Sequence, residues 1–175
     1  MKHTLLLFSL ALSCTIAFSQ DMSLQWAKQI GGTGNQYINS VARDAFNNTV
    51  VVGQYEGVVD FDPSAGSAIS SSTGQFDAFI AKYDPTGNFL WKYHFGNSEQ
   101  DYAWDVAIDG SGFIYVVGEA RGAVDIDMNT ETTDVDNVSI GSFGFLIKLD
   151  GSGAHVWSKI WDGTTGNTNK LTQVA

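Results

Sequence analysis

Cysteine, proline and basic residues are scarce in this sequence. Its 175 residues include one cysteine and two prolines. The cysteine, Cys14, lies near the N-terminus, so the rest of the chain has no thiol for a disulfide or for cysteine chemistry. Nine Lys and Arg against nineteen Asp and Glu give a net charge of −10. Such an acidic chain is poorly suited to nucleic acid or to an anionic membrane surface.

Long apolar runs are also lacking, apart from Leu5–Ile16. This run follows Lys2 and precedes Ala17-Phe18-Ser19. A basic start, a short apolar run and small residues at the end are typical of a secretory signal peptide, here residues 1–19. The run is too short to span a bilayer. We therefore expect no transmembrane segment in the mature chain, residues 20–175, and a secreted or cell-surface location.

A lipoprotein signal is the alternative to ordinary cleavage after residue 19. It would use Cys14 as the lipidated residue. Ala11 stands three residues before it, where a large aliphatic residue is expected. This departure favours the ordinary signal peptide.

No segment beyond the signal shows the 3.6-residue apolar period of a helix, so the mature chain is expected to be all-β. Its clearest unit is Asp77–Gly96, which predicts two strands joined by the turn Asp84-Pro85-Thr86-Gly87-Asn88. Phe89, Trp91, Tyr93 and Phe95 alternate along the second strand, so they share one face. Residues 143–163 repeat this hairpin, and residues 24–32 repeat its second half.

Subtraction of matching positions gives the length of the repeat. Trp26 and Trp91 are 65 positions apart, as are Gly53 and Gly118, and Trp157 follows Trp91 by 66 positions. A repeat of this length holds about four short strands, as one blade of a β-propeller does. We expect repeats near 33–97 and 98–163 and the start of a third at 164–175.

Two four-stranded antiparallel blades are therefore predicted. Residues 24–32 should form a strand that resembles the last strand of a preceding blade. Gly53 within a strand should mark a bulge or a close backbone approach. The strands of the two blades are expected near 38–45, 49–55, 77–83 and 89–95, and near 102–108, 113–119, 144–149 and 155–160.

The segments SVARDAFNNTVVVGQYEGVVDFDP and GQFDAFIAKYDPTGNFLWKYHFG, with their second copies, resemble the SBBP-type β-propeller repeat. The resemblance covers Leu24 to Ala175. Gly144 in the place of Asp77 is one departure. The resemblance implies a large secreted or surface protein of Bacteroidota-like bacteria, and it supplies no catalytic residue. Because propellers close with about four to eight blades, it also predicts that this chain is an N-terminal fragment with the remaining blades missing.

An acidic connection in the second repeat is the only candidate metal site. Asp125, Asp127, Asn129 and Glu131 place oxygen ligands at alternate positions, as a Ca²⁺ ion would need. The EF-hand pattern is not met, because Thr130 replaces its glycine. The competing interpretation is a solvated loop whose aspartates cap turns.

The histidines and tryptophans favour structural roles. His94 follows Trp91 whereas His155 precedes Trp157, so the two histidines do not occupy matched positions, and no zinc-binding spacing is present. The repeated Trp26, Trp91 and Trp157 could stack on a sugar, but repetition at one strand position favours packing between blades. Trp104 and Trp161 lie outside that register and are better candidates for exposed contacts.

Two functional hypotheses follow. The first is an exported, non-enzymatic propeller module for adhesion, scaffolding or recognition of a protein or glycan, without a cofactor unless Ca²⁺ binds. The alternative is a carbohydrate-active hydrolase or lyase built on a propeller. A catalytic site usually breaks the repeat at one blade, whereas these copies differ mainly in the acidic connection of the second.

Overall fold

The computed structural model describes residues 24, 26–127, 136–162 and 171–175. The signal peptide, Asn129, Glu131 and most of the third repeat lie outside them. Strands and turns make up the regular structure of this part of the chain, as the prediction of an all-β fold required. The strands are β1 (Gly31–Gly32), β2 (Gln36–Arg43), β3 (Thr49–Tyr55), β4 (Val58–Asp60), β5 (Ile69–Ser71), β6 (Asp77–Tyr83), β7 (Phe89–Phe95), β8 (Tyr102–Ile108), β9 (Ile114–Val124), β10 (Asp136–Leu149) and β11 (His155–Asp162).

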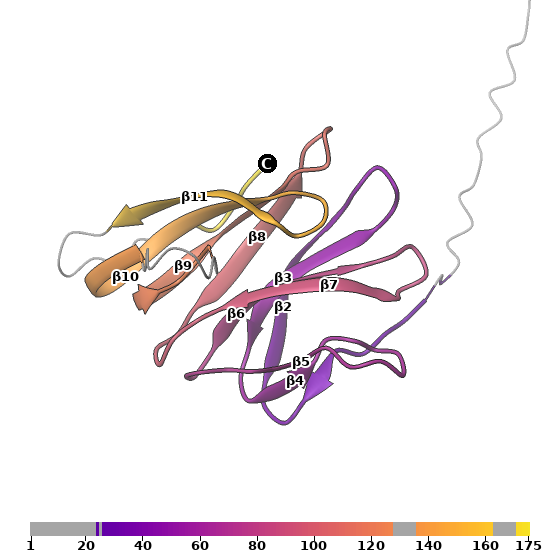
Figure 1. Cartoon of the computed structure of the whole chain (residues 1–175), viewed down its shortest axis with the longest axis horizontal. Helices are drawn as coiled ribbons and strands as arrows, with labels where there is room; N and C mark the ends of the chain where they lie inside the picture. Colours follow the sequence, from indigo (N-terminus) through magenta and orange to yellow (C-terminus); the bar gives the residue numbers. More distant parts are fainter. Residues whose placement is uncertain (1–23, 25, 128–135, 163–170) are drawn as a thin grey trace, which may run out of the picture.

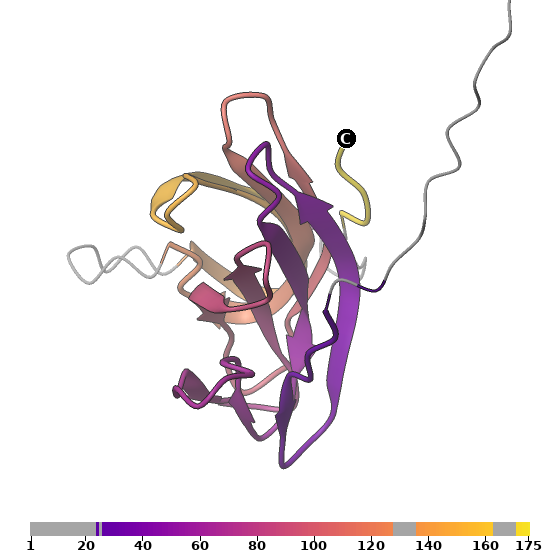
Figure 2. The same cartoon turned by 90° about the vertical axis from the view of Figure 1, so that its right-hand side faces the viewer.

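Two four-stranded antiparallel sheets form the body of the molecule (Figure 1). We call the sheet ordered β2-β3-β6-β7 blade 1, and the sheet ordered β8-β9-β10-β11 blade 2. Each meanders so that consecutive strands of the repeat are neighbours, as in a propeller blade. Figure 2 shows the two sheets packed against each other, with β8 of blade 2 next to blade 1.

The predicted strand at 24–32 is mostly wrong. Among its described residues, only Gly31–Gly32 forms a strand, β1, which pairs with β4. Residues 26–30 make no ladder with any strand of the described residues. Residues 24–32 have the side-chain pattern of the last strand of a blade. A strand also needs a neighbouring strand with which its backbone can form hydrogen bonds.

Other boundaries differ by a few residues. The predicted strand at 38–45 is β2 at Gln36–Arg43, because Asp44 already begins a turn. The connection between β3 and β6 contains the short hairpin β4–β5. In blade 2 the corresponding strands continue instead as the long β9 and β10.

The register corrects one alignment between the repeats. Asp77 lies opposite Tyr55, and Phe143 lies opposite Ala120. Tyr55 and Ala120 are 65 positions apart and therefore equivalent. Phe143, not Gly144, thus stands in the place of Asp77.

Gly53 lies at a bulge, as predicted. The pairing of β2 with β3 shifts between Ile38 and Ser40, and a Cβ built on Gly53 would lie 1.8 Å from the carbonyl oxygen of Tyr37. Gly118 repeats this, with 2.0 Å to the carbonyl oxygen of Tyr102. Only glycine leaves room for the neighbouring strand at these two positions.

Four five-residue turns in the described part of the two blades share one geometry. Each begins with an aspartate whose Oδ1 accepts the backbone N–H groups two and four residues later. The fourth residue of each has a positive φ. The carboxylate satisfies donors that the tight turn cannot pair with the strands. The four turns are 44–48, 84–88, 109–113 and 150–154.

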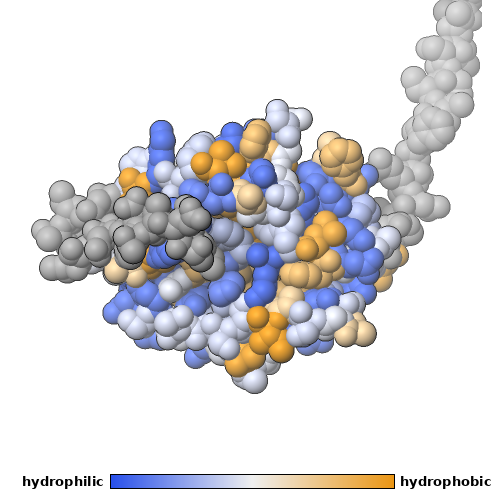
Figure 3. Space-filling model, viewed as in Figure 1, coloured by the Kyte–Doolittle hydropathy of each residue, from blue (hydrophilic) through white to orange (hydrophobic). Residues whose placement is uncertain are grey.

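The larger apolar core lies between the blades. One face of blade 1, with Val52, Ile80 and Phe95, packs on one face of blade 2, with Phe145 and Ile147. The aromatic rings of Phe95 and Phe145 meet edge to face with centroids 5.1 Å apart. The surface is mixed, and Figure 3 shows apolar residues in separate patches among polar ones. Among the described residues, no helix has the length and apolar character needed to cross a membrane.

Candidate interaction surface

The contact between the two blades is anchored by Trp91 of β7. Its indole Nε1–H donates to the carbonyl oxygen of Gly151, at 3.3 Å, in the last turn of blade 2. The indole also lies over Gly153 of that turn, where an added Cβ would come within 2.7 Å of the ring. Gly153 has a φ of 88°. A glycine is thus required both by the turn and by the tryptophan that covers it.

Trp26 makes the same contact on blade 1. Its Nε1–H donates to the carbonyl oxygen of Pro85 at 3.1 Å, and a Cβ on Gly87 would lie 2.9 Å from its ring. Pro85 and Gly151 are 66 positions apart and hold the same place in their turns. The prediction that these tryptophans pack between blades is confirmed for Trp91, whereas Trp26 packs on a turn of blade 1 from a segment that is not a strand. Residues 26–30 therefore contact the last turn of blade 1 in the way that β7 contacts the last turn of blade 2.

Lys82 adds a second link at the same turn. Its Nζ donates to the carbonyl oxygen of Gly151 at 2.9 Å and forms a salt bridge of 2.9 Å with Asp44. Both side chains are nearly buried. Burial would raise the pKa of Asp44, but hydrogen bonds from Asn48 and Lys82 outweigh it and hold this pKa below its ordinary value.

The other face of blade 1 is partly open, and we call it the outer face. Ile38 and Val41 of β2 are 57% and 59% exposed there. Their equivalents in blade 2, Ala103 and Val106, are 0% and 5% exposed because blade 1 covers them. The same strand position is thus buried in blade 2, where blade 1 packs on it, and open in blade 1, where no other sheet of the described residues packs on it.

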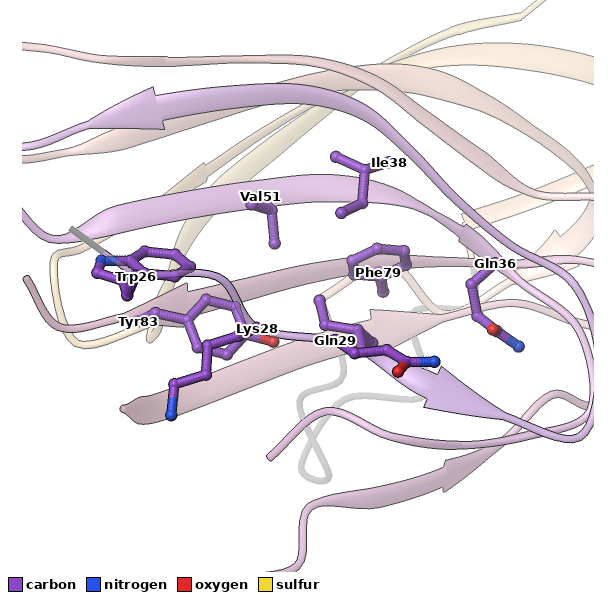
Figure 4. A pocket seen from close by; sticks show the side chains of 9 residues that line it. Trp26, Lys28, Gln29, Gln36, Ile38, Val51, Phe79 and Tyr83 are labelled. Carbon is purple, nitrogen blue, oxygen red and sulfur yellow. The ribbon is translucent and has the colours of Figure 1, made fainter. Parts of the chain in front are cut away.

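A pocket of about 360 Å³ lies on this outer face, between residues 26–30 and the sheet (Figure 4). Trp26 and Tyr83 stand at one end, and Phe79 and Gln36 stand toward the other. Its walls are largely apolar side chains of β2, β3 and β6. On blade 2 the equivalent face is covered by blade 1, so this pocket lies where a neighbouring blade would pack. We therefore interpret the pocket as a place for protein packing.

The acidic connection can be described only in part. Asp125 and Asp127 follow β9 directly, whereas Asn129 and Glu131 lie outside the described residues, so the calcium site stays a prediction. In the first repeat, Asp60 Oδ1 accepts the N–H of Asp62 at 3.0 Å. The carboxylate of this aspartate thus caps its own loop.

The two histidines come closer than their sequence positions suggested. His94 and His155 line one pocket of about 400 Å³, with Lys92 and Asp127. His94 Nδ1 lies 3.3 Å from the hydroxyl of Tyr55, and burial lowers the pKa of His94, so this imidazole is neutral at pH 7. The described residues contain no group of three or more His, Cys, Asp or Glu side chains placed to hold a metal.

Asp101 is a buried carboxylate that the sequence did not single out. It accepts the backbone N–H of Arg121 at 3.0 Å and that of Asn97 at 2.9 Å, and so ties the start of blade 2 to β9. Burial raises the pKa of Asp101 to about 6 in spite of these bonds. Asp77, also buried, has a raised pKa for the same reason. Both carboxylates hold connections between strands.

Trp104 belongs to a row of aromatic side chains along the first strands of the two blades. Its ring stacks on Tyr102 with centroids 4.9 Å apart. Phe76 contacts both Tyr102 and Tyr37. Trp104 is half-buried whereas Trp161 is 43% exposed, so the expected exposure applies better to Trp161.

The comparisons with known proteins agree with a repeat architecture. No family model matches the chain. The chain is 29% identical, over 114 residues, to an uncharacterized WD repeat-containing protein of Acanthamoeba polyphaga mimivirus, a match that covers 57% of this chain. It is 24% identical, over 130 residues, to the regulatory protein FlaEY of Caulobacter vibrioides, and this match covers 74% of the chain. The matches span only 8% and 13% of those two proteins.

WD repeats are among the sequences that build β-propellers. With the 65-residue period and two four-stranded antiparallel sheets, the partial similarity defines an all-β chain whose sheets have the form of propeller blades. The narrower assignment to the SBBP-type repeat stays a prediction.

Proposed function

We propose that this chain is part of an exported, non-enzymatic β-propeller protein that serves adhesion, scaffolding or recognition at or outside the cell surface. The proposal includes the SBBP-type repeat and a signal peptide at residues 1–19. The supporting observation is the repeated contact between blades. Trp26 and Trp91 cover equivalent turns, and the outer face of blade 1 presents Ile38 and Val41 where blade 2 buries their equivalents.

This surface suits a further blade. Residues 26–30 already occupy the place of that blade's last strand, so the partner would supply three strands and use residues 26–30 as its fourth. The aliphatic side chains Ile38 and Val41 would then be removed from water, which favours the contact by about 25 cal/mol per Å² of apolar surface. The remaining blades are proposed to come from a longer form of the protein.

Two experiments test the proposal as a whole. N-terminal sequencing of the protein from its native host should begin at or near Gln20, and fractionation should find it outside the cytoplasm. Recovery of intact Met1 on cytoplasmic protein contradicts the export signal. A hydrolase and lyase screen on the complete protein should show no turnover, and turnover of a polysaccharide would favour the enzymatic alternative.

Calcium binding at the acidic connection is a separate proposal. It rests on the alternation of Asp125, Asp127, Asn129 and Glu131. Calorimetry should detect Ca²⁺ binding by the full chain, and Asp127→Ala should abolish it. No heat at millimolar Ca²⁺ would remove the proposal.

A further inference from the structure

Phe46 departs from the pattern of the four turns. The third residue of the other three is a small hydroxyl residue, namely Thr86, Ser111 or Ser152. Phe46 is 80% exposed, and only its backbone N–H takes part in its turn, donating to Asp44 Oδ1 at 2.9 Å. Neither the turn nor the core needs this ring. A single exposed apolar side chain is ordinary, so a functional role for Phe46 has to be argued from the residues around it.

Phe46 lines a pocket of about 490 Å³. The pocket lies where the turn 44–48 of blade 1 meets the turns 109–113 and 150–154 of blade 2. Its size is within the usual range for small-molecule sites. Apart from the ring, the wall carries polar side chains and backbone from turns of both blades, including Asn48, Ser111 and Gly151. The hollow therefore combines one aromatic face with several hydrogen-bonding groups.

The charges at this pocket cancel. Asp44 and Lys82 both line it, but they form a salt bridge of 2.9 Å with each other. Lys82 also donates to the carbonyl oxygen of Gly151. A phosphate or carboxylate ligand would need a cation that is not already paired. The pocket thus favours a neutral ligand that is rich in hydroxyl groups.

We propose that this pocket binds one unit of a neutral saccharide, with Phe46 as its stacking platform. The apolar C–H face of a sugar ring would lie on the phenyl ring, and its hydroxyls would exchange hydrogen bonds with Asn48, Ser111 and the turn backbone. This inference rests on the proposed recognition function and narrows its ligand to a neutral glycan. It assigns no role to the repeated tryptophans, whose rings cover the turns.

The test compares Phe46→Ser with two other variants of the full chain. Phe46→Ser gives this turn the residue type of the other three, so the fold should keep its melting temperature. Phe46→Trp keeps an aromatic platform. Leu90→Ser removes a side chain that is 47% exposed on β7 and is not part of the pocket wall. The probes are immobilised cello-, xylo-, manno- and chito-oligosaccharides, followed by titration calorimetry on those that bind.

We expect the unmodified chain and Leu90→Ser to bind at least one of these oligosaccharides equally well. Phe46→Ser should weaken that binding by about tenfold, the loss of one aromatic contact, and Phe46→Trp should keep it. The proposal is overturned if the unmodified chain binds none of the probes, or if Phe46→Ser binds like the unmodified chain. Export and cell-surface location are measured separately, so the proposed function can stand when this site fails.

Discussion

The indole N–H of Trp91 reaches across the blade interface to the carbonyl oxygen of Gly151, and Trp26 reaches the equivalent carbonyl oxygen of Pro85 in the same way. Trp91 thus joins blade 1 to the last turn of blade 2, and Trp26, which precedes blade 1 in the chain, makes the same contact with the last turn of blade 1. This relationship explains why tryptophan recurs with the repeat although none of these rings is fully buried. By the same register, we propose that Trp157 would cover the equivalent turn of a further blade.

Gly153 and Gly112 provide a matched test of this contact. Both have positive φ, 88° and 85°, but an added Cβ would meet the Trp91 ring at Gly153 and nothing within 4 Å at Gly112. Gly112→Ala should therefore cost about 1 kcal/mol of unfolding free energy from backbone strain. Gly153→Ala should cost more, because the tryptophan must also move. Denaturation in urea measures both.

The excess cost of Gly153→Ala should vanish when Trp91→Ala is also present. This double-mutant comparison isolates the contact between the two residues. If Gly153→Ala still costs more than Gly112→Ala when the Trp91 indole is absent, the extra cost comes from another part of the turn. Trp91→Ala alone should cost about 2 kcal/mol, less than the 3–5 kcal/mol typical of a fully buried tryptophan.

Lys82→Met tests the second link. The substitution keeps most of the apolar stem but removes the group that pairs with Asp44 and donates to Gly151. A nearly buried carboxylate then loses its cation, which should cost about 2–4 kcal/mol. Lys159→Met is the control, since Lys159 forms no salt bridge among the described residues. Equal urea midpoints for the two variants would contradict a structural role for Lys82.

Asp101 should make stability depend on pH between about 4 and 6. The native pKa of about 6 exceeds the ordinary value of about 4, so the native state holds this proton more tightly than the unfolded chain does. The contribution of Asp101 is therefore fully present below pH 4 and is lost as the pH rises through 6. The loss is on the order of 3 kcal/mol.

Asp101→Asn cannot titrate, so it isolates this effect from the other carboxylates. Relative to the variant, the unmodified chain should lose stability between pH 4 and pH 7, as measured by urea denaturation at each pH. A stability difference that is the same at both ends of this range would show that Asp101 has an ordinary pKa in the native state.

Most of the fold could be predicted because its signals are local. Alternating aromatic residues and turn residues placed β6 at 77–83, β7 at 89–95 and β8 at 102–108, all of which are confirmed. The strand predicted at 24–32 failed because its residues lack a neighbouring strand among those described. A side-chain pattern alone cannot supply backbone hydrogen bonds.

The candidate surfaces could be predicted only where the repeat itself carried the information. The packing of Trp26 and Trp91 followed from their shared position. Lys82, Asp101 and Phe46 were missed because their meaning depends on contacts between turns and blades that are distant in sequence. The departure of Phe46 from the hydroxyl residues at the matching turn positions was the one signal that could have found it.

The central claim is that the outer face of blade 1 is a packing surface for a further blade. The most direct measurement is the mass in solution of residues 20–175, by light scattering over a range of concentrations. We predict association or aggregation of this chain, and a shift toward monomer in Ile38→Asp with Val41→Asp. Phe46→Asp, which removes an exposed apolar side chain at a turn, should associate like the unmodified chain. A stable, monodisperse monomer at every concentration would contradict the claim and indicate a β fold that closes on itself.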